Sequence, residues 1–382
     1  MNITIVGGGP AGTYASYLLS KKGEQVLLLD HKIPWEKSCG GGITWKAIKE
    51  FPFLQKTHLK PFEASELEFI SPRGRDQLLL LKKPIFIFSR KELGLYLLKM
   101  AQGAGVHYRR EKVQTITASS KGWEIITNQG SYKCNLLIGA DGAQSFVRRF
   151  VGQKLSRDGL YFSLATLVKG DYGKRIIIKF VKDLKGYIWI FPRKESTSIG
   201  ICSDVATFQP QRLKGILLQF LAEKFNGAFD KIKFKAAWIP VLSNRGDKSI
   251  KFCGEKWALI GDAASLADPI TGEGIYYAFK SAQLLAESLK KDSFSEFPQL
   301  LKADFLPHLI KASQIKEKFF QPAFLERMLF LLTFSPSVRE VVLQIIDGEL
   351  NYGELKRRLL SKTFSIAGEI IIAFLSRLIS GR

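Results

Sequence analysis

The sequence predicts an α/β fold in which a Rossmann-type, dinucleotide-binding domain is assembled from separated stretches of the chain. Three observations predict it. A short apolar strand opens the chain and leads directly into Gly7-Gly8-Gly9-Pro10-Ala11-Gly12. Two further apolar strands, ending before Asp141 and Asp262, have the composition of strands buried in a parallel sheet. A β-rich block lies between those two strands, and helical periodicity dominates residues 293–382.

Residues 1–30 have the pattern of a strand, a glycine turn, a helix, a second strand and a final acidic residue. In a G-x-G-x-x-G turn, Gly7 makes the tight turn, Gly9 lets a pyrophosphate approach the backbone, and Gly12 lets helix and strand pack closely. The pyrophosphate would lie on the helix N-terminus. Asp30 would accept a hydrogen bond from a ribose hydroxyl. A glycine turn without a ligand is the alternative, and the order of the elements favours the dinucleotide site.

An unusual run of glycines follows this unit, in Cys39-Gly40-Gly41-Gly42. Each glycine costs backbone entropy on folding, so the run predicts a place where the backbone passes close to a ligand. We expect next a helix over 44–51, a hairpin of strands 67–70 and 77–81, a strand over 85–88 and a helix over 90–102.

The β-rich block runs from residue 161 to 239, with strands over 163–168, 175–180, 187–191, 198–202 and 233–238 and one helix over about 211–225. An apolar strand over 257–260 and a helix over 275–289 return to the first domain. The predicted domains are therefore a discontinuous cofactor-binding domain (1–60, 84–158 and 252–292), a β-rich substrate domain (61–83 and 159–251) and a C-terminal helical region (293–382).

Composition narrows the class of partner. The chain of 382 residues has 57 Lys and Arg against 35 Asp and Glu, a net charge of +22, which favours an anionic partner such as a membrane surface, an acidic protein or a phosphorylated substrate. A lysine-rich composition without any partner is the alternative. Nucleic acid is not expected, because no nucleic-acid motif accompanies the charge.

The cysteines and the apolar runs indicate the cellular compartment of the protein. The four cysteines are scattered, so neither a metal site nor a disulfide framework is expected, and a reducing compartment is favoured. No signal peptide and no apolar run of about 20 residues is visible. We expect a cytoplasmic protein, soluble or peripheral on the inner face of the membrane.

Two more motifs join the first glycine turn. Residues 140–148 have the pattern D-G-x-x-S-x-x-R, and Gly261-Asp262-Ala263-Ala264 is followed by Pro269-Ile270-Thr271-Gly272-Glu273-Gly274-Ile275. Together they resemble the FAD-binding signatures of the p-hydroxybenzoate hydroxylase-like flavoprotein superfamily. The resemblance implies a discontinuous FAD-binding domain. The cofactor-binding residues it implies are Gly7, Gly9, Ala11, Gly12, Asp30, Arg90, Asp141, Gly142, Gly261, Asp262, Pro269, Gly272, Gly274 and Ile275.

These residues have readable roles in such a site. Asp262 can bond a ribityl hydroxyl, which is its usual role in that superfamily. Gly272 and Gly274 leave room for the isoalloxazine. The helix that begins at Ile275 can turn N–H groups toward the N1–C2=O edge of the flavin, where positive potential stabilises the reduced anion. Arg90 resembles the arginine that approaches the cofactor; a surface cation is its alternative.

Two features resemble the geranylgeranyl reductase family within that superfamily: the C-G-G-G loop at Cys39 and the Y-x-W-x-F-P motif at residues 187–192. The resemblance implies an FAD-dependent oxidoreductase acting on CH–CH groups, which saturates an isoprenoid chain of a lipid or prenyl diphosphate. Tyr187, Trp189 and Phe191 alternate along a strand and so share one face, which suits such a chain, although ordinary core aromatics are the alternative.

Within the glycine loop, Cys39 is the only obvious protic side chain, and we predict a catalytic role for it in a proton relay. A small buried thiol is the alternative. Gly40 and Gly41 join the three aromatic residues as predicted substrate-binding residues.

Other functions and partners stay open at this point. An oxygen-using flavoenzyme is the first alternative: a monooxygenase, or a halogenase, whose W-x-W-x-I-P motif differs at Tyr187 and Phe191. A non-catalytic flavin-binding protein of the membrane surface is the second. No second G-x-G-x-x-G lies on a strand–helix junction, so the electrons for FAD come either from transient NAD(P)H docking or from an acidic carrier such as ferredoxin.

The C-terminal region has both apolar and basic segments. Apolar residues 370–375 and basic residues 356–358 predict an interfacial helix on an anionic bilayer. A helical cap buried on the rest of the protein is the alternative.

Overall fold

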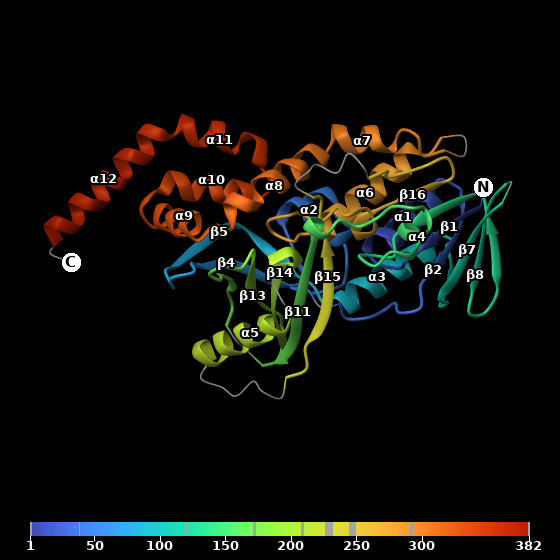
Figure 1. Cartoon of the computed structure of the whole chain (residues 1–382), viewed down its shortest axis with the longest axis horizontal. Coiled ribbons are helices and arrows are strands. Elements are labelled where there is room, and N and C mark those ends of the chain that lie inside the picture. Colours follow the sequence, from blue (N-terminus) through green and yellow to red (C-terminus); the bar gives the residue numbers. More distant parts are fainter. Residues whose placement is uncertain are drawn as a thin grey trace. The chain divides into compact units, whose positions relative to one another are not determined.

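A computed structural model describes residues 2–37, 39–119, 121–170, 173–207, 210–225, 232–243, 250–290 and 293–380. The chain forms two compact units, each made of three stretches. The first unit contains residues 1–37, 89–161 and 237–314, and the second contains residues 38–88, 162–236 and 315–382. The predicted α/β fold class is confirmed: a discontinuous Rossmann-type sheet, a large second sheet and a helical C-terminal region (Figure 1).

A five-stranded parallel sheet forms the centre of the first unit, in the order β16-β10-β1-β2-β6. The inner strand β10 is apolar and fully buried, and its neighbour β1 is buried from Ile3 to Val6, because both faces of a parallel sheet are covered. The strands are β1 (Asn2–Val6), β2 (Gln25–Leu29), β6 (His107–Arg109), β10 (Leu136–Gly139) and β16 (Trp257–Leu259). Strands from three distant parts of the sequence therefore lie side by side, as predicted.

Helices α1 (Pro10–Lys21), α3 (Arg90–Gly103) and α6 (Ile275–Ser288) pack together in this unit, with α1 in contact with both others. Tyr14 of α1 meets Phe279 of α6 edge to face, with 5.5 Å between ring centroids. The unit also contains α4 (Phe146–Phe150), α7 (Phe297–Ala303) and a separate antiparallel sheet of β7 (Val113–Ser119), β8 (Gly122–Thr127) and β9 (Ser131–Cys134).

An eight-stranded sheet, in the order β15-β11-β14-β13-β12-β4-β5-β3, organises the second unit. The first residues of β11 and the last residues of β15 belong to the first unit. Among the described pairings only β4–β12 is parallel. The strands are β3 (Gly42–Ile43), β4 (Phe62–Ile70), β5 (Asp76–Ile87), β11 (Leu160–Lys169), β12 (Ile176–Phe180), β13 (Gly186–Pro192), β14 (Ser196–Asp204) and β15 (Lys235–Pro240).

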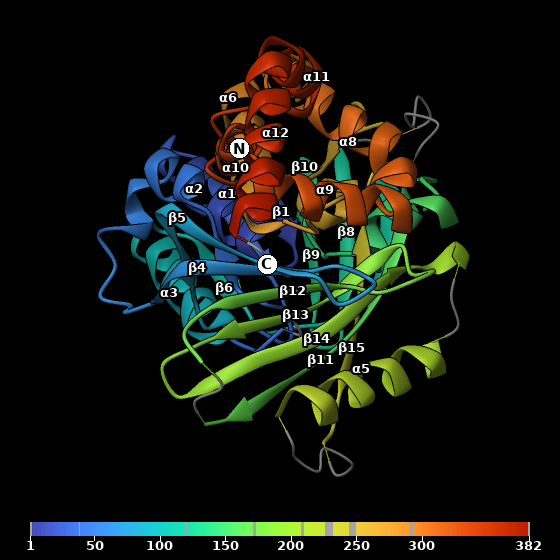
Figure 2. The same ribbon diagram turned by 90° about the vertical axis from the view of Figure 1, so that its left-hand side faces the viewer.

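Helices cover both faces of this sheet. On one face Leu213, Leu217 and Leu221 of α5 (Pro210–Phe225) pack against alternate isoleucines of β13 and β14. On the other face α9 (Pro322–Phe334) and α10 (Pro336–Ile346) pack against β5 and β12 (Figure 2). The remaining helices are α2 (Trp45–Glu50), α8 (Leu306–Phe319), α11 (Tyr352–Ser361) and α12 (Thr363–Ser380).

One predicted strand is not separate. The predicted hairpin is longer than expected, and residues 85–87 are the end of β5 rather than a strand of their own. The pattern around Lys82-Lys83-Pro84 resembled a break, but it lies in an irregular stretch of the ladder, where the register against β4 shifts between Ala64 and Glu66. A bulge accommodates a proline without ending the strand.

The compact units divide the chain differently from the predicted functional domains. Residues 38–60 lie in the second unit with β5, and residues 293–314 lie in the first unit, where α7 contacts α6. In the described residues no single helix is long and apolar enough to span a membrane. Two bent helix pairs reach that length and composition together: α9 with α10, bent by 112°, and α11 with Thr363–Ser376, bent by 64°.

Candidate flavin site and substrate face

The glycine turn after β1 has a separate physical requirement at each glycine. Gly7 has φ +106°, and a Cβ there would lie 2.3 Å from the carbonyl oxygen of Ala140. A Cβ on Gly12 would lie 1.8 Å from the carbonyl oxygen of Gly7, so only glycine lets α1 pack against the turn. A Cβ on Gly9 would meet no atom of the described part of the chain within 4 Å. Gly9 therefore presents bare backbone at the N-terminus of α1, as the approach of a pyrophosphate requires.

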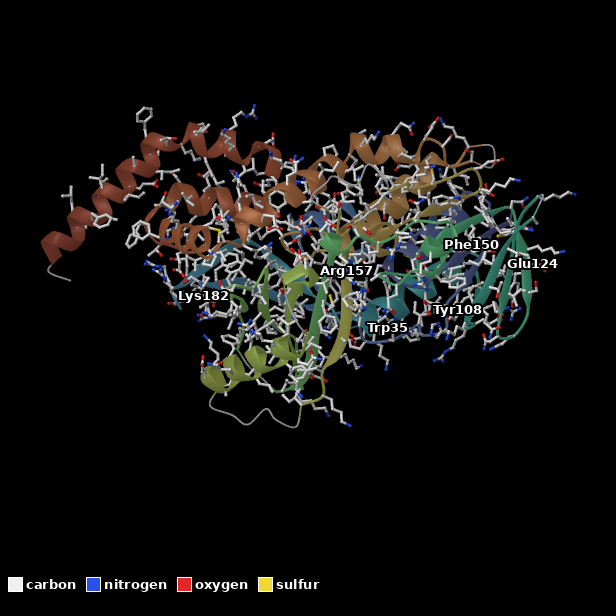
Figure 3. The ribbon with its side chains drawn as sticks, viewed as in Figure 1. Trp35, Tyr108, Glu124, Phe150, Arg157 and Lys182 are labelled. Atoms are coloured by element: carbon white, nitrogen blue, oxygen red, sulfur yellow. The ribbon has the colours of Figure 1, made fainter. Side chains whose placement is uncertain are left out.

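Asp30 lies at the end of β2, next to this turn. Its Oδ2 accepts from the backbone N–H of Gly8 at 2.7 Å, and its Oδ1 accepts from those of Lys32 and Ile33 at 2.6 and 3.0 Å. The hydroxyl of Tyr108 (Figure 3) donates to the Asp30 carbonyl at 3.1 Å. The carboxylate is thus fixed in place by backbone donors, and its two oxygens retain capacity for a ribose hydroxyl.

Asp141 follows β10 and caps the short helix α4. It accepts from the Ser145 hydroxyl and from the backbone N–H groups of Phe146 and Val147, the latter two at 2.6 and 3.1 Å. Burial raises the pKa of Asp141, and these hydrogen bonds oppose the rise. Arg148 donates to the carbonyls of Ala143 and Ala263 at 2.5 and 3.1 Å. The D-G-x-x-S-x-x-R motif therefore joins residues 141–148 to residues 261–264. Gly142, with φ +79°, forms its turn.

Asp262 lies in a short 3-10 helix, Gly261–Ala264, directly after β16. Its Oδ2 accepts from the Lys37 ammonium at 2.8 Å, with both side chains mostly buried. A Cβ on Gly274 would lie 3.2 Å from Asp262 Oδ1, so glycine at that position leaves room around the carboxylate. Sequence reasoning missed Lys37, because a basic residue in a loop has no distinctive pattern and its partner is 225 positions away.

The loop between Asp262 and α6 is held by Asp268. Its Oδ1 accepts from the backbone N–H groups of Ile270 and Thr271, each at 2.8 Å, and its carbonyl accepts from Gly272 at 2.9 Å. The Tyr161 hydroxyl donates to the Pro269 carbonyl at 2.9 Å. No side-chain hydrogen bond caps the start of α6. The positive end of the helix dipole lies at this start, so it suits an electron-rich ligand edge.

Arg90 is the first residue of α3, and Glu36 accepts from its backbone N–H at 3.2 Å. The Nε of Arg90 is buried and has no hydrogen-bond partner among the described residues. A buried unpaired donor is costly, so this atom fits a partner supplied by a bound cofactor. The bare backbone at Gly9, the uncapped start of α6 and this orphaned donor all fit FAD.

In the second unit, the glycine loop packs against the sheet. A Cβ on Gly40 or Gly42 would lie 3.1 or 2.7 Å from the Phe191 ring. Gly41 has φ +82°, and a Cβ there would lie 2.4 Å from the Phe88 carbonyl oxygen. Contacts within the protein thus account for all three glycines. A ligand is therefore not needed to explain why three glycines follow one another, and the predicted close approach of a ligand stays a prediction.

Cys39 is held at the start of this loop. Its carbonyl accepts from the Ser198 hydroxyl at 2.9 Å and from the Arg193 guanidinium at 3.3 Å, and the Gly41 backbone N–H approaches its Sγ at 3.4 Å. The Trp189 indole N–H donates to Ser198 at 3.3 Å. The second unit therefore brings Cys39, Gly40, Gly41, Trp189 and Phe191 together. Burial raises the pKa of Cys202 to about 12, which makes that thiol inert.

The three aromatic residues of β13 share a face, as alternation predicts. Their neighbours Ile188 and Ile190 pack toward α5 on the opposite face. Tyr187 meets Trp189 edge to face at 6.3 Å between centroids, and it packs toward the cluster that contains Phe320 and Leu325. Trp189 is itself buried. Tyr187 and Phe191 are half-buried.

Comparison with known proteins supports the flavin site. A family described as pyridine nucleotide-disulphide oxidoreductase matches residues 4–162. The menaquinone reductase of Mycolicibacterium smegmatis is 25% identical, over 85% of this chain and 86% of that protein. The geranylgeranyl diphosphate reductase of Synechocystis is 26% identical, over 76% and 75%. An uncharacterized protein of Methanosarcina barkeri is 29% identical, over 82% and 81%.

Solved structures show the same fold. A geranylgeranyl bacteriochlorophyll reductase-like protein of Thermoplasma acidophilum superposes with a TM-score of 0.77 at 21% identity, covering 94% of this chain and 98% of that one. A flavin-dependent brominase superposes with a TM-score of 0.72 at 17% identity, covering 91% and 94%.

The fold, the three motifs and these relatives define an FAD-dependent oxidoreductase. Within that class, the predicted resemblance to the geranylgeranyl reductase family is confirmed by curated relatives of that name. The solved structures include both a reductase-like protein and a halogenase, so the fold alone does not separate those two activities.

Proposed function

We propose that the chain saturates double bonds of an isoprenoid, geranylgeranyl-type chain carried on a lipid or a prenyl diphosphate. The observation that carries the proposal is the assembly in the second unit: Phe191 lies against the C-G-G-G loop, and Trp189 bonds the Ser198 hydroxyl that holds the Cys39 carbonyl. Both motifs that resemble geranylgeranyl reductases thus form one structure. Curated relatives named geranylgeranyl diphosphate reductase and digeranylgeranylglycerophospholipid reductase support the same substrate class.

An isolated alkene sets the chemical requirement. It has no carbonyl to polarise, so a hydride and a proton must reach its two carbons almost together, in a site that excludes water. Reduced FAD supplies the hydride when it is bound. The chain's own contribution is the aromatic face of β13, which can bind an apolar chain and exclude water, and a proton donor near it.

For the proton donor we propose Cys39. The Ser198 and Arg193 bonds fix its backbone. A thiol that also receives an N–H, here from Gly41, is stabilised when it becomes a thiolate, as proton donation requires. Cys39→Ala should abolish most prenyl reduction while FAD content stays normal. Cys253→Ala, which removes another half-buried thiol, is the control. Near-normal prenyl reduction by Cys39→Ala would show that Cys39 is not the proton donor.

The remaining substrate and cofactor roles keep their predicted assignments as proposals. FAD would be held by the residues around Gly9, Asp30, Arg90, Asp262 and Gly274. Its reductant would be either NAD(P)H or an acidic carrier such as ferredoxin, which the net charge of +22 would attract. We further propose that the protein works in the cytoplasm and reaches a lipid substrate from the inner face of the membrane.

A flavin-dependent halogenase or monooxygenase is the second candidate, favoured by the superposition with the brominase. A single experiment separates the candidates: anaerobic turnover of the dithionite-reduced enzyme with a geranylgeranyl lipid, read by product mass. A reductase adds two hydrogens per saturated bond. Incorporation of oxygen or halogen only when O₂ is supplied would replace the proposal with the second candidate. A protein that binds FAD but converts nothing would be a non-catalytic flavin-binding protein.

A further inference from the structure

A cavity of about 400 Å³ lies in the second unit between the β4–β5 turn and α9, away from the glycine loop. Three arginines line it, Arg73 and Arg75 from the turn and Arg327 from the helix, together with Glu326 and Phe330. Glu326 accepts from the backbone N–H of Arg73 at 2.7 Å, so one of its carboxylate oxygens is bonded to the turn. The cavity therefore keeps an excess of positive charge.

Aromatic contacts join this cavity to the C-terminal helix. The Arg75 guanidinium lies over the Phe330 ring, 5.5 Å from its centroid. Phe330 in turn lies 6.3 Å from the ring of Phe374 in α12. The arginines and α12 therefore belong to one continuous surface of this unit.

The outer face of α12 is strongly apolar and exposed. Phe364, Ile371 and Leu375 are 94, 59 and 52% exposed and recur at the spacing of one helical face. Ile372 and Phe374, also more than half exposed, flank them. The outer part of the helix extends away from α9 and α10 (Figure 1), and mostly carbon-only side chains project from it (Figure 3). So much contiguous apolar surface marks an interaction site.

We propose that α12 and the arginine cavity, here called the docking surface, bind an anionic lipid bilayer, with α12 inserted at the interface and the arginines contacting lipid phosphates. An interfacial helix combines such an apolar face with adjacent cations. A second copy of the chain is a poorer occupant, because a symmetric contact would bring the two arginine clusters together. The inference extends the proposed membrane association by naming its surface, and it does not depend on the reductase chemistry.

The test is flotation of the full-length, FAD-loaded protein with vesicles of phosphatidylcholine, with and without phosphatidylglycerol. Replacing all three arginines (Arg73→Gln, Arg75→Gln and Arg327→Gln) should weaken binding to the anionic vesicles roughly a hundredfold, at about fivefold per arginine. Replacing the apolar face (Ile371→Ser, Ile372→Ser and Leu375→Ser) should abolish flotation with both kinds of vesicle. If the triple arginine variant fails to fold, each single variant should still lose about fivefold.

A matched control removes the same charge from the other unit: Lys112→Gln, Lys121→Gln and Lys133→Gln, all exposed. It should float almost like the parent. Equal weakening in both charge variants would overturn the inference, because overall charge alone would then drive binding. A second result would also overturn it: the arginine variant loses pyrophosphate binding but floats like the parent. The cavity would then be a site for a free anion.

Two further outcomes are informative. If sedimentation shows a dimer that the apolar variant dissociates while vesicle binding persists, α12 is a self-association surface and the inference falls. Reduction of a detergent-dispersed substrate should be unchanged in the arginine variant. If the parent protein floats but shows no turnover, the proposed function is wrong, while the proposed docking surface is still supported.

Discussion

At the glycine turn after β1, three residues with the same side chain meet three different environments. Gly7 needs a positive φ, Gly12 lies against the backbone of Gly7, and Gly9 has an ordinary φ of −70° with nothing near its Cα hydrogens. The first two glycines are required by the fold. Gly9 is required only by something that approaches the turn from outside.

This contrast predicts opposite outcomes for two alanine substitutions. Gly9→Ala should destabilise the FAD-free protein by only about 1 kcal/mol, since Ala is a poorer N-cap than Gly but its methyl group displaces no atom of the described residues. It should weaken FAD binding by about tenfold or more, because the methyl group occupies the approach of the pyrophosphate. Gly12→Ala should cost about 3 kcal/mol or more through overlap with the Gly7 carbonyl.

Thermal melting of the FAD-free variants and titration by flavin fluorescence measure the two effects separately. A Gly9→Ala protein that binds FAD as tightly as the parent would place the pyrophosphate elsewhere. The residues of the turn could be predicted from sequence because their spacing is local. Lys37 and Glu36 could not, because each acts through a partner distant in the chain, Asp262 and the start of α3 respectively.

At the scale of elements, the start of α3 shows how a loop residue positions a site residue. Glu36 accepts from the Ser89 hydroxyl and from the backbone N–H groups of Arg90 and Lys91, at 3.0 to 3.2 Å. The carboxylate thus caps the helix and also lies at its positive end. It fixes the residue whose buried Nε fits the cofactor.

We therefore expect Glu36→Ala to destabilise α3 by about 1 kcal/mol and to weaken FAD binding by roughly fivefold through Arg90. Glu92→Ala is the control, because it removes a negative charge from the first turn of α3 without removing a bond to Arg90. Hydrogen exchange of the first turn of α3 and FAD titration report the two effects. Equal behaviour of the two variants would mean that only the helix dipole is involved.

A second prediction at this scale concerns pH. Glu340 of α10 accepts from the Lys362 ammonium, at the end of α11, at 2.9 Å, and this bond lowers the pKa of Glu340 below its ordinary value of about 4.5. Because the folded-state pKa is the lower one, the bond stabilises the protein above the ordinary pKa, and this contribution is lost as pH falls through the folded-state value.

The pair is partly exposed, so its contribution is only about 0.5 kcal/mol. Glu340→Gln should accordingly speed hydrogen exchange in α11 about twofold at pH 7 relative to the parent. After correction for the intrinsic exchange rate, the difference should shrink as the pH falls below the ordinary Glu pKa and through the lower folded-state pKa. A difference that persists at low pH would mean that packing, and not the ion pair, holds α11 on α10.

At the scale of the whole molecule, the architecture could be predicted from the sequence, whereas the division into compact units had a weaker signal. Apolar strands far apart in the chain identified the parallel sheet, since buried parallel strands have a distinctive composition. The boundary at residue 293 had no such signal. Residues 293–314 and 315–382 share helical periodicity, but they bury their apolar faces in different units. Periodicity reports that a helix has a buried face and not which partner covers it.

That difference decides where the chain can be shortened. A cut after Leu289 would remove Phe294, Phe297 and Leu301, all fully buried in the first unit, and should prevent folding. A cut after Lys362 would remove only α12. The hydrogen bonds that the Glu369 carboxylate accepts from Ser335 and Ser337 would be lost, together with the packing of Ile366 and Phe374.

We expect the protein cut after Lys362 to lose about 2 to 3 kcal/mol of stability, since it gives up the hydrogen bonds of the Glu369 carboxylate to Ser335 and Ser337 and modest apolar packing. It should keep its FAD, because the described residues that fit the cofactor all lie in the first unit. Reduction of a detergent-dispersed substrate should persist, while flotation with anionic vesicles is lost. Absorbance of bound flavin, product mass and flotation measure the three properties on one preparation. A shortened protein that still floats would show that α12 is a structural cap, and that the bilayer, if the protein binds one, contacts a different surface.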